Sequence, residues 1–206
     1  MMKSYIIAML LPFFLITIFN IFLNKSSKTL NKKIYWQHYF FGYLFILYLM
    51  ISLKEVVGFP CLSEWQRFSK LNKPIFNPNI NLIPFSDGFE ISAILNILFF
   101  MPFGFLLPTL WQKFRNFLPT LCYGLIFSMI IEFGQLFTNG RGTDVTDLIM
   151  NSLGAILGWL IFKVLRKVFL KLSSNTVVEI SNKDSLILKL EPYMYVAITV
   201  ICTLIS

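Results

Sequence analysis

Between residues 96 and 151 the chain carries seven side chains of the kinds that acid–base chemistry and anion binding require. Carboxylates act as general acids, general bases or cation ligands, and a guanidinium clamps a carboxylate or phosphate with two parallel hydrogen bonds. Amide side chains donate and accept further hydrogen bonds. The seven candidate residues are Asn96, Glu132, Gln135, Arg141, Asp144, Asp147 and Asn151.

The composition of the chain indicates what surrounds these residues. Of its 206 residues, 56% are apolar and 14% are charged, and the mean hydropathy is +0.70. Ordinary soluble domains carry about 45–50% apolar and about 25% charged residues. These values exclude a disordered chain, a nucleic-acid-binding domain and a secreted disulfide scaffold. The sequence predicts an all-α, polytopic membrane bundle of five to six transmembrane helices.

The predicted spans follow from the length of the apolar segments, because a spanning helix needs about 20 mostly apolar residues. A sixth segment, Pro192–Ser206, is short for a crossing, and it either spans with a tilt or lies as an interfacial helix. The segment before it, 172–191, is polar and has no clear period. The five clearer spans are Tyr5–Leu23, Tyr39–Leu53, Ile91–Leu110, Phe117–Phe137 and Leu148–Phe162.

The distribution of Lys and Arg orients the bundle, since these residues gather in cytoplasmic loops. With six spans and the N-terminus outside, the inward segments hold twelve of them and the outward segments hold six. The long loop 54–90 and the short loop 138–147 are therefore predicted to face outward. The net charge of +8 is accounted for by this bias and by contact with anionic lipid headgroups.

Glu132 lies inside the fourth predicted span, five residues from its outer end. A rise of about 1.5 Å per residue puts it about 7 Å below the outer interface. Gln135 follows by three positions and Ser128 precedes by four, so the three side chains share one helix face. A charge at the centre of a span costs at least about 2.5–3.5 kcal/mol on insertion scales, so Glu132 needs a partner or a function.

The neighbouring spans supply polar groups at a similar depth. Asn96 lies five residues into the third span, and Asn151 lies about one turn into the fifth. Asp144 and Asp147 share a helix face with Asn151, because the three are spaced i, i+3 and i+7. Either Thr143 or Asp144 can cap the N-terminus of the fifth span, where the helix dipole favours carboxylates.

Arg141 lies between these carboxylates, in the turn Asn139–Gly142. Together the seven residues are predicted to converge on one pocket at the outer membrane face. The alternative is structural: Asn96 and Asn151 would be interhelical hydrogen-bond partners, and Asp144 a helix cap. In that interpretation an ion pair between Arg141 and Asp147 stiffens the turn.

Other conspicuous residues have simpler interpretations. Cys122 and Cys202 lie in apolar runs and are expected to be small core residues, so no structural disulfide is expected. His38, the only histidine, is expected to contact lipid headgroups. Gly154 and Gly158 have the spacing that lets two helices pack closely. The chain shows no metal-ligand spacing, phosphate-binding loop or nucleophile elbow, and it identifies no cofactor.

Three segments resemble the VanZ-like membrane proteins. The first is Asn81–Phe85, and the second is Asn96–Phe105 with its Pro-x-Gly. The third and most specific is Glu132–Gly158, which contains Glu-x-x-Gln, Arg-Gly-Thr-Asp-x-x-Asp and Asn-x-x-Gly. The resemblance covers roughly Tyr35–Phe162. The family's polar residues correspond to the same seven positions that the depth argument selects.

The resemblance implies a role in the cell envelope. The founding member of the family is associated with low-level resistance to the glycopeptide teicoplanin in Gram-positive bacteria, without alteration of the D-Ala-D-Ala end of the precursor. It also implies an organisation in three parts. Residues 1–34 would form the first transmembrane helix and a cationic loop, 35–165 the VanZ-like membrane domain, and 166–206 a cytoplasmic linker followed by the short sixth segment.

The main hypothesis is an outward-facing polar pocket that binds an anionic lipid or a lipid-linked envelope precursor. Arg141 and the helix N-terminus near Asp144 would hold the phosphate, with Asn96, Gln135 and Asn151 as further substrate-binding residues. The partners expected are therefore membrane lipids and such a precursor, with a homo-oligomer as a further option. No nucleic acid is expected.

Two alternatives remain open at this point. The first is a membrane enzyme acting on a lipid phosphate or a cell-wall substrate, with Glu132 as acid or base and Asp144 and Asp147 as further catalytic residues. In that case the two aspartates could hold a divalent cation, although two carboxylates are few ligands for one. The second is a small proton-coupled lipid transporter. Few spans and no internal repeat weigh against a transporter.

Overall fold

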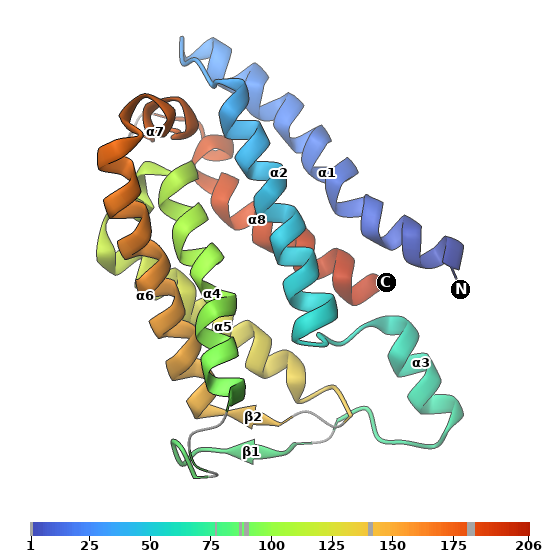
Figure 1. The fold of residues 1–206 in the computed structure, drawn as a ribbon. Helices are drawn as coiled ribbons and strands as arrows, with labels where there is room; N and C mark the ends of the chain where they lie inside the picture. The colour runs from blue at the N-terminus through green and yellow to red at the C-terminus, as the bar shows by residue number, and fades with distance from the viewer. Residues whose placement is uncertain (1, 77, 87, 89–90, 140–141, 181–183) are drawn as a thin grey trace.

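The fold is described from a computed structural model that covers residues 2–76, 78–86, 88, 91–139, 142–180 and 184–206. The described residues are mostly helical, and the longest helices form one bundle (Figure 1). The α-helices are α1 (Met2–Thr29), α2 (Trp36–Ile51), α3 (Leu62–Lys70), α4 (Ile91–Leu110), α5 (Phe117–Gln135), α6 (Val145–Val168), α7 (Leu170–Thr176) and α8 (Leu186–Ile205). A π-helical turn, Ser52–Val56, extends α2, and a 3₁₀ helix, Gln112–Arg115, joins α4 to α5.

Within the described residues, six helices are long and apolar enough to cross a membrane. They are α1, α2 with its π-helical extension, α4, α5, α6 and α8. The prediction of an all-α polytopic bundle is confirmed. We call the end of the bundle that carries α3 the outer end and the end that carries α7 the inner end, following the Lys and Arg count (Figure 1).

Several helix boundaries differ from the prediction, including those of α6 and α8. Helix α6 begins at Val145 rather than Leu148 and continues to Val168 rather than Phe162. Helix α8 begins at Leu186, six residues before Pro192, and with 20 residues it is long enough to span. Both predicted segments were too short because polar residues inside a helix were taken as its ends.

Two short strands close the outer end of the bundle. Strand β1 (Ile80–Asn81) pairs in parallel with β2 (Thr143–Asp144), and Asn81 lies opposite Asp144. β1 belongs to the loop before α4, and β2 directly precedes α6. The pairing therefore brings the entrances of two parallel helices together, at the bottom of Figure 1.

Among the described elements, the contact between α4 and α6 is the most extensive. Three glycines make this possible, because a Cβ on Gly154, Gly158 or Gly104 would clash with the backbone carbonyl of Ile97, Met101 or Ala155 respectively. The backbones of the two helices thus touch directly. The prediction that Gly154 and Gly158 are packing residues is confirmed.

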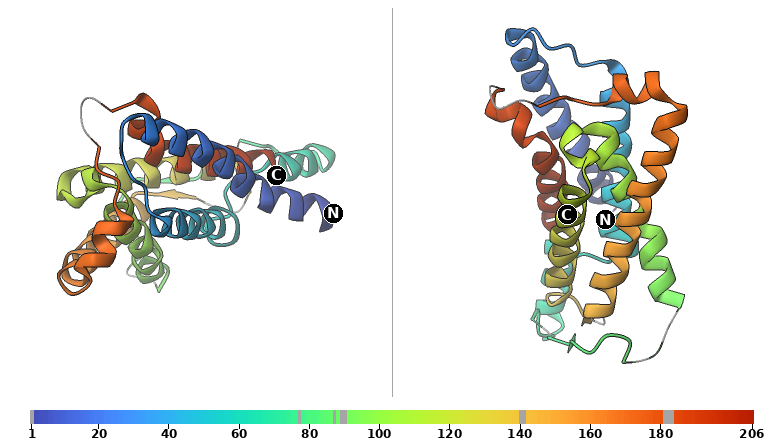
Figure 2. Two further views of the ribbon diagram at one scale, coloured as in Figure 1. Left: turned by 90° about the horizontal axis from the view of Figure 1, so that it is seen from above. Right: turned by 90° about the vertical axis from the view of Figure 1, so that its left-hand side faces the viewer.

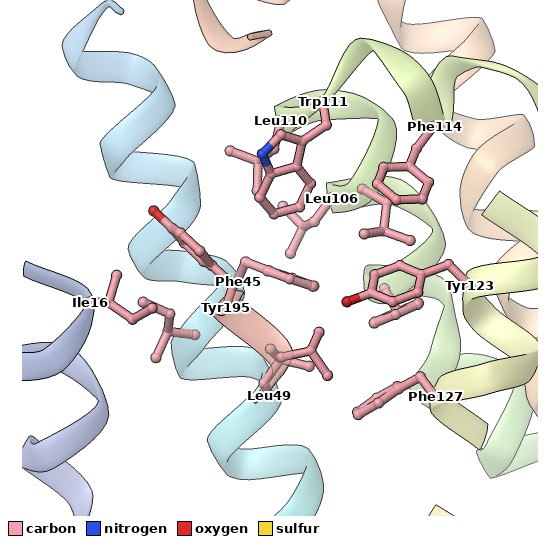
Figure 3. Packing of buried hydrophobic residues seen from close by; sticks show 14 of the residues in the cluster. Ile16, Phe45, Leu49, Leu106, Leu110, Trp111, Phe114, Tyr123, Phe127 and Tyr195 are labelled. Carbon is pink, nitrogen blue, oxygen red and sulfur yellow. The ribbon is translucent and has the colours of Figure 1, made fainter. Parts of the chain in front are cut away.

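Aromatic side chains fill the interior of the bundle (Figure 3). The rings of Phe103 in α4 and Phe127 in α5 stack with their centroids 4.7 Å apart. Trp111 and Tyr195 are fully buried, and their rings meet edge to face at 5.6 Å. The first contact joins α4 to α5, and the second joins α8 to the residue that follows α4.

Helix α1 lies at the side of the bundle, where it contacts α8 and, to a smaller extent, α2 (Figure 2). Hydrogen bonds attach it to α2 and α8: Thr17 Oγ1 lies 2.8 Å from the Tyr43 hydroxyl, and the Tyr195 hydroxyl donates to Asn20 Oδ1 at 3.0 Å. The remaining described surface of α1 is largely apolar and exposed, as expected for a face toward lipid.

His38 is buried, with an exposed fraction of 1%, so the expected contact with lipid headgroups is wrong. Its Nε2 lies 2.7 Å from Oε1 of Glu191 in α8, and its Nδ1 lies 2.8 Å from the Thr176 carbonyl oxygen. Because a carbonyl only accepts, Nδ1 carries a hydrogen, and one further proton is shared between Nε2 and Glu191. This pair ties α2 to α8.

The cysteines are free thiols, as expected. Cys202 is buried, which fits the prediction of a core residue. Cys122 is exposed on the surface of α5, so the prediction of a core position is wrong for this residue. A small apolar side chain is equally compatible with the lipid-facing surface of a span, and hydropathy does not distinguish the two.

Candidate functional site

Polar side chains from five elements gather at the outer end of the bundle. The last turn of α5, the first turns of α6 and α4, and both strands contribute. The carboxylates come from three of these elements, so no single helix holds them together. We call this cluster the outer polar site; it consists of Asn81, Asn96, Glu132, Gln135, Asp144 and Asp147.

Glu132 is the most buried carboxylate of the outer polar site, with an exposed fraction of 6%. Its Oε2 accepts a hydrogen bond from the backbone N–H of Asp144 at 3.0 Å. The hydroxyl of Thr143 donates to the Glu132 carbonyl oxygen at 2.8 Å. Strand β2 is thereby held against the last turn of α5, and among the described residues the carboxylate is anchored by a backbone N–H.

Gln135 lies one turn further along α5 and is 5% exposed. In the amide orientation that satisfies its neighbours, the side-chain nitrogen lies 2.8 Å from the Gly142 carbonyl oxygen and 3.2 Å from Glu132 Oε2. Glu132 Oε2 therefore faces two N–H donors. The shared helix face predicted for Glu132 and Gln135 is confirmed by this contact.

Asp144 caps helix α6. Its Oδ1 accepts from the backbone N–H of Thr146 at 2.6 Å, which is the N-cap geometry expected for Asp. Its Oδ2 accepts from Asn81 Nδ2 at 3.3 Å. The Thr146 hydroxyl in turn accepts from the Phe85 N–H at 3.0 Å. The loop before α4 is thus bonded to the start of α6.

Asp147 joins the first turns of α6 and α4. Its Oδ1 accepts from Asn96 Nδ2 at 2.6 Å. Both Asp147 and Asp144 are close enough to Glu132 to interact with it electrostatically. Three carboxylates therefore converge at the outer end, as the spacing in the sequence predicted.

Asn151 lies one turn deeper than this cluster. Its Nδ2 donates to Ser128 Oγ at 2.9 Å, and both side chains are buried between α6 and α5. This contact is the interhelical hydrogen bond of the structural alternative. A substrate-binding role for Asn151 stays a prediction.

Arg141, the cation predicted for the pocket, lies outside the described residues. Its expected ion pair with Asp147 and its expected contact with a phosphate both stay predictions. Of the seven candidate residues, the structure therefore describes six. It brings five of these together and places the sixth, Asn151, below them.

Comparison with known proteins adds the family. The family model described as VanZ/LLP1 matches residues 40–166, which is more than half of the chain and includes the whole outer polar site. The chain belongs to the VanZ/LLP1 family. Six candidate spans together with this membership make it a multi-pass membrane protein.

One curated protein that is similar in sequence to this VanZ/LLP1 chain is Protein VanZ of Enterococcus faecium. The two are 36% identical over 81 residues, which is 39% of this chain and 50% of the relative. The chain thus spans about half the length of the curated relative that it matches. No solved structure matches the chain.

The outer polar site of this VanZ/LLP1 chain includes a residue that sequence reasoning missed. Asn81 binds Asp144, and its Oδ1 also accepts from the Ile83 N–H at 3.2 Å, which shapes the turn before α4. Asn81 begins the first of the three resembling segments, and that was the available signal. It was missed because a residue in a loop has no helical spacing relative to the others.

The chemistry of the outer polar site is dominated by hydrogen-bond acceptors. Three carboxylates face the side-chain N–H groups of Asn81, Asn96 and Gln135. Such a site suits a ligand that brings its own donors, namely hydroxyl, amide or ammonium groups. Among the described residues, no group of three or more His, Cys, Asp or Glu side chains is placed to hold a metal ion.

Proposed function

We propose that this member of the VanZ/LLP1 family contributes to tolerance of teicoplanin-type glycopeptides. Its outer polar site would do so by binding an anionic lipid or a lipid-linked envelope precursor. The observation that carries the proposal is the convergence of Glu132, Asp144 and Asp147 at one end of a membrane bundle. Buried carboxylates are costly in a membrane, and convergence from three elements goes beyond what packing requires.

The acceptor-rich chemistry favours the lipid-linked precursor over a simple anionic lipid. The sugar hydroxyls and peptide amides of such a precursor donate hydrogen bonds, which the carboxylates of the site can accept. On chemical grounds we assign its phosphate to Arg141, since a guanidinium binds phosphate with two parallel hydrogen bonds. A precursor held here would be less available to a drug that captures it at the membrane surface.

A second candidate function, a membrane enzyme, is favoured by the placement of Glu132. Its carboxylate is fixed by a backbone N–H at 3.0 Å and lies near two further carboxylates. A positioned, largely water-excluded carboxylate beside others is the arrangement that general acid–base catalysis uses. The substrate class would be the same lipid-linked phosphate.

The proposed function is tested by teicoplanin susceptibility in a susceptible Gram-positive host. We compare wild type, Glu132→Gln and Arg141→Ala at equal membrane levels. Glu64→Gln is the matched control, because Glu64 lies in α3 at the same end of the bundle and pairs with Arg67 at 3.4 Å rather than with a residue of the site. We expect protection from wild type and from the control, and loss of most protection in the other two variants.

Protection that survives both Glu132→Gln and Arg141→Ala would contradict the proposal and leave the outer polar site a packing element. The two candidate functions are then separated by mass spectrometry of lipid extracts. A new lipid species that wild type produces and Glu132→Gln does not would identify an enzyme. Unchanged lipid composition with protection by wild type would favour binding alone.

A further inference from the structure

The inner end of the bundle holds a cavity of about 450 Å³, remote from the outer polar site. Its walls come from the loop after α1, the 3₁₀ helix after α4, the end of α6 and the segment that follows α7. Segments far apart in the sequence thus meet around it, near the top of Figure 1. We call it the inner basic cavity, after its cationic lining residues Lys32, Lys33, Arg115 and Arg166.

Two guanidinium groups share this cavity. Arg115 is held in place, because its Nη2 donates to the carbonyl oxygen of Ser173 at 2.7 Å and to the Ser173 hydroxyl at 2.9 Å. Burial, and then the like charge of Arg166, lower the pKa of Arg115 to about 10, so it remains cationic at neutral pH. Within the described part of the chain, no hydrogen bond or ion pair engages Arg166, whose side chain is exposed.

The carboxylates near the cavity do not balance its cations. Lys32 pairs with Asp184, and Glu179 is the carboxylate among the described lining residues. Four cations against these two carboxylates leave an excess of two positive charges. Lys33 lies over the ring of Tyr35 at 4.9 Å, an aromatic residue of the kind found at membrane interfaces.

An apolar groove adjoins the inner basic cavity and shares Arg166 with it. The groove runs between α2, α4, α6 and α7, and the Arg115 guanidinium lies 5.7 Å from the ring of Phe162 in its wall. A basic pocket that continues into an apolar groove fits a ligand with an anionic head and a hydrocarbon chain. The groove is lined chiefly by Phe41, Phe105, Phe162, Leu165, Phe169 and Leu172.

We propose that the inner basic cavity and the adjoining groove form a binding site for an anionic phospholipid of the inner leaflet. Arg166, Lys33 and Arg115 bind its phosphate, and the methylenes of one acyl chain nearest the headgroup enter the groove, whose volume is about 80 Å³. Clusters of Lys and Arg at the cytoplasmic face of a membrane attract anionic headgroups. The site differs in position and in charge from the outer polar site, so this inference does not depend on the proposed function.

The proposal is tested by native mass spectrometry of the purified full-length chain with phosphatidylglycerol or phosphatidylcholine of identical acyl chains. We expect wild type to bind phosphatidylglycerol preferentially. The variant Lys33→Gln/Arg166→Gln should bind it about twenty-five-fold more weakly, because each cation beside an anionic headgroup contributes about fivefold. The matched control is Lys167→Gln/Lys171→Gln, which removes the same charge from the same end, outside the cavity lining.

Two further measurements separate the sources of the phosphate group. Leu165→Trp fills the groove without a change of charge, and it should weaken phosphatidylglycerol binding. Inorganic phosphate, added at the same concentration as the lipid, should not displace it. Equal displacement by inorganic phosphate would show a site for a free anion and overturn the lipid assignment. An equal loss of binding in the Lys167→Gln/Lys171→Gln control would overturn the assignment of the cavity.

Thermal stability and elution as a single species are compared for every variant before the lipid measurements. If Lys33→Gln/Arg166→Gln is as stable as wild type and still prefers phosphatidylglycerol to the same degree, the proposal is wrong. If that variant is unstable, Leu165→Trp decides, since its effect on lipid binding does not depend on the removed charges.

Discussion

Two buried glutamates in this bundle are stabilised in different ways. Glu132 receives N–H donors from a strand backbone and an amide side chain at the outer end, whereas Glu191 faces the imidazole of His38 in the interior. Within the part of the chain that the structure describes, Glu191 Oε2 has no hydrogen-bond partner, and the side chain is 0% exposed. Among these residues, His38 is therefore the hydrogen-bond partner that compensates the buried carboxylate.

A double-mutant cycle tests this dependence. Each of His38→Leu and Glu191→Leu alone should destabilise the protein by about 3–5 kcal/mol, because each leaves one buried polar partner unpaired. The double variant should recover a large part of that loss, since two apolar residues leave nothing unpaired. Thermal unfolding of the purified protein in detergent measures all four forms.

The result that would contradict this view is simple additivity. If the double variant is destabilised by the sum of the two single effects, then His38 and Glu191 act independently, and Thr176 rather than Glu191 is the partner that matters for the histidine.

At the residue scale, prediction from the sequence succeeded where spacing and charge were both informative. Glu132, Asp144 and Asp147 stood out because carboxylates near the outer ends of apolar segments are rare. The sequence placed Glu191 in a polar linker rather than in a helix. Its partner His38 lies 153 residues away in the chain, so nothing in the sequence indicated that the carboxylate is paired. A pairing at that distance becomes visible only when the helices are packed.

At the scale of elements, the contact between α4 and α6 positions much of the outer polar site. The two helices run in parallel from the outer end, and Asn96 near the start of α4 faces Asp147 near the start of α6. The spacing of Gly154 and Gly158 predicted a close contact, and the structure identifies their partners as Ile97 and Met101. The sequence could not identify these partners, since a glycine can pack against the backbone of any spanning helix.

Gly158→Ala tests the backbone contact between α4 and α6. The added methyl group would overlap the Met101 carbonyl oxygen, so the helices must separate, and overpacking of this kind costs about 1–3 kcal/mol. We expect a lower unfolding temperature and reduced protection against teicoplanin, because the Asn96–Asp147 hydrogen bond lies along the same interface.

Gly124→Ala is the matched control for this substitution. Its added Cβ would lie 3.0 Å from the Ala155 side chain, and a small shift relieves that contact more readily than a clash with backbone. If Gly124→Ala proves as disruptive as Gly158→Ala, the backbone contact between α4 and α6 has no special weight.

Helix ends were the least predictable elements. Hydropathy placed the start of the fifth span at Leu148, but the helix begins at Val145, directly after its Asp144 cap. The first turn of α6 contains Asp147, which accepts a hydrogen bond from Asn96. A polar residue marks the end of a helix only when it lacks such a partner, and hydropathy does not report partners.

For the molecule as a whole, the two ends of the bundle differ in charge. Three of the described carboxylates gather at the outer polar site, whereas four cations line the inner basic cavity. This difference in charge agrees with the orientation inferred from the Lys and Arg count. The orientation itself stays a prediction. The division of the chain into three parts at residues 34 and 165 likewise stays a prediction.

Thiol labelling in intact cells tests the orientation. In a variant without native cysteines, Lys70→Cys at the end of α3 should react with a membrane-impermeant maleimide, because α3 is predicted to face outward. Lys171→Cys in α7 should react only after the cells are opened. Both positions are exposed, so a difference in labelling reports the side of the membrane rather than burial.

The reverse labelling pattern would show that the bundle has the opposite orientation in the membrane. It would place the outer polar site in the cytoplasm and exclude direct contact with a drug target outside the cell. Equal labelling of both positions before the cells are opened would indicate a leaky preparation, and a known cytoplasmic cysteine in the same cells serves as the internal control.

The direct backbone contact between α4 and α6 excludes lipid tails from the space between them. When the bilayer thins or thickens with growth temperature or acyl-chain composition, we expect these two helices to tilt together, and the peripheral α1 to adjust separately. The distance between Asn96 and Asp147 should therefore change little with bilayer thickness. A change in lipid composition should then leave the hydrogen bonds of the outer polar site intact.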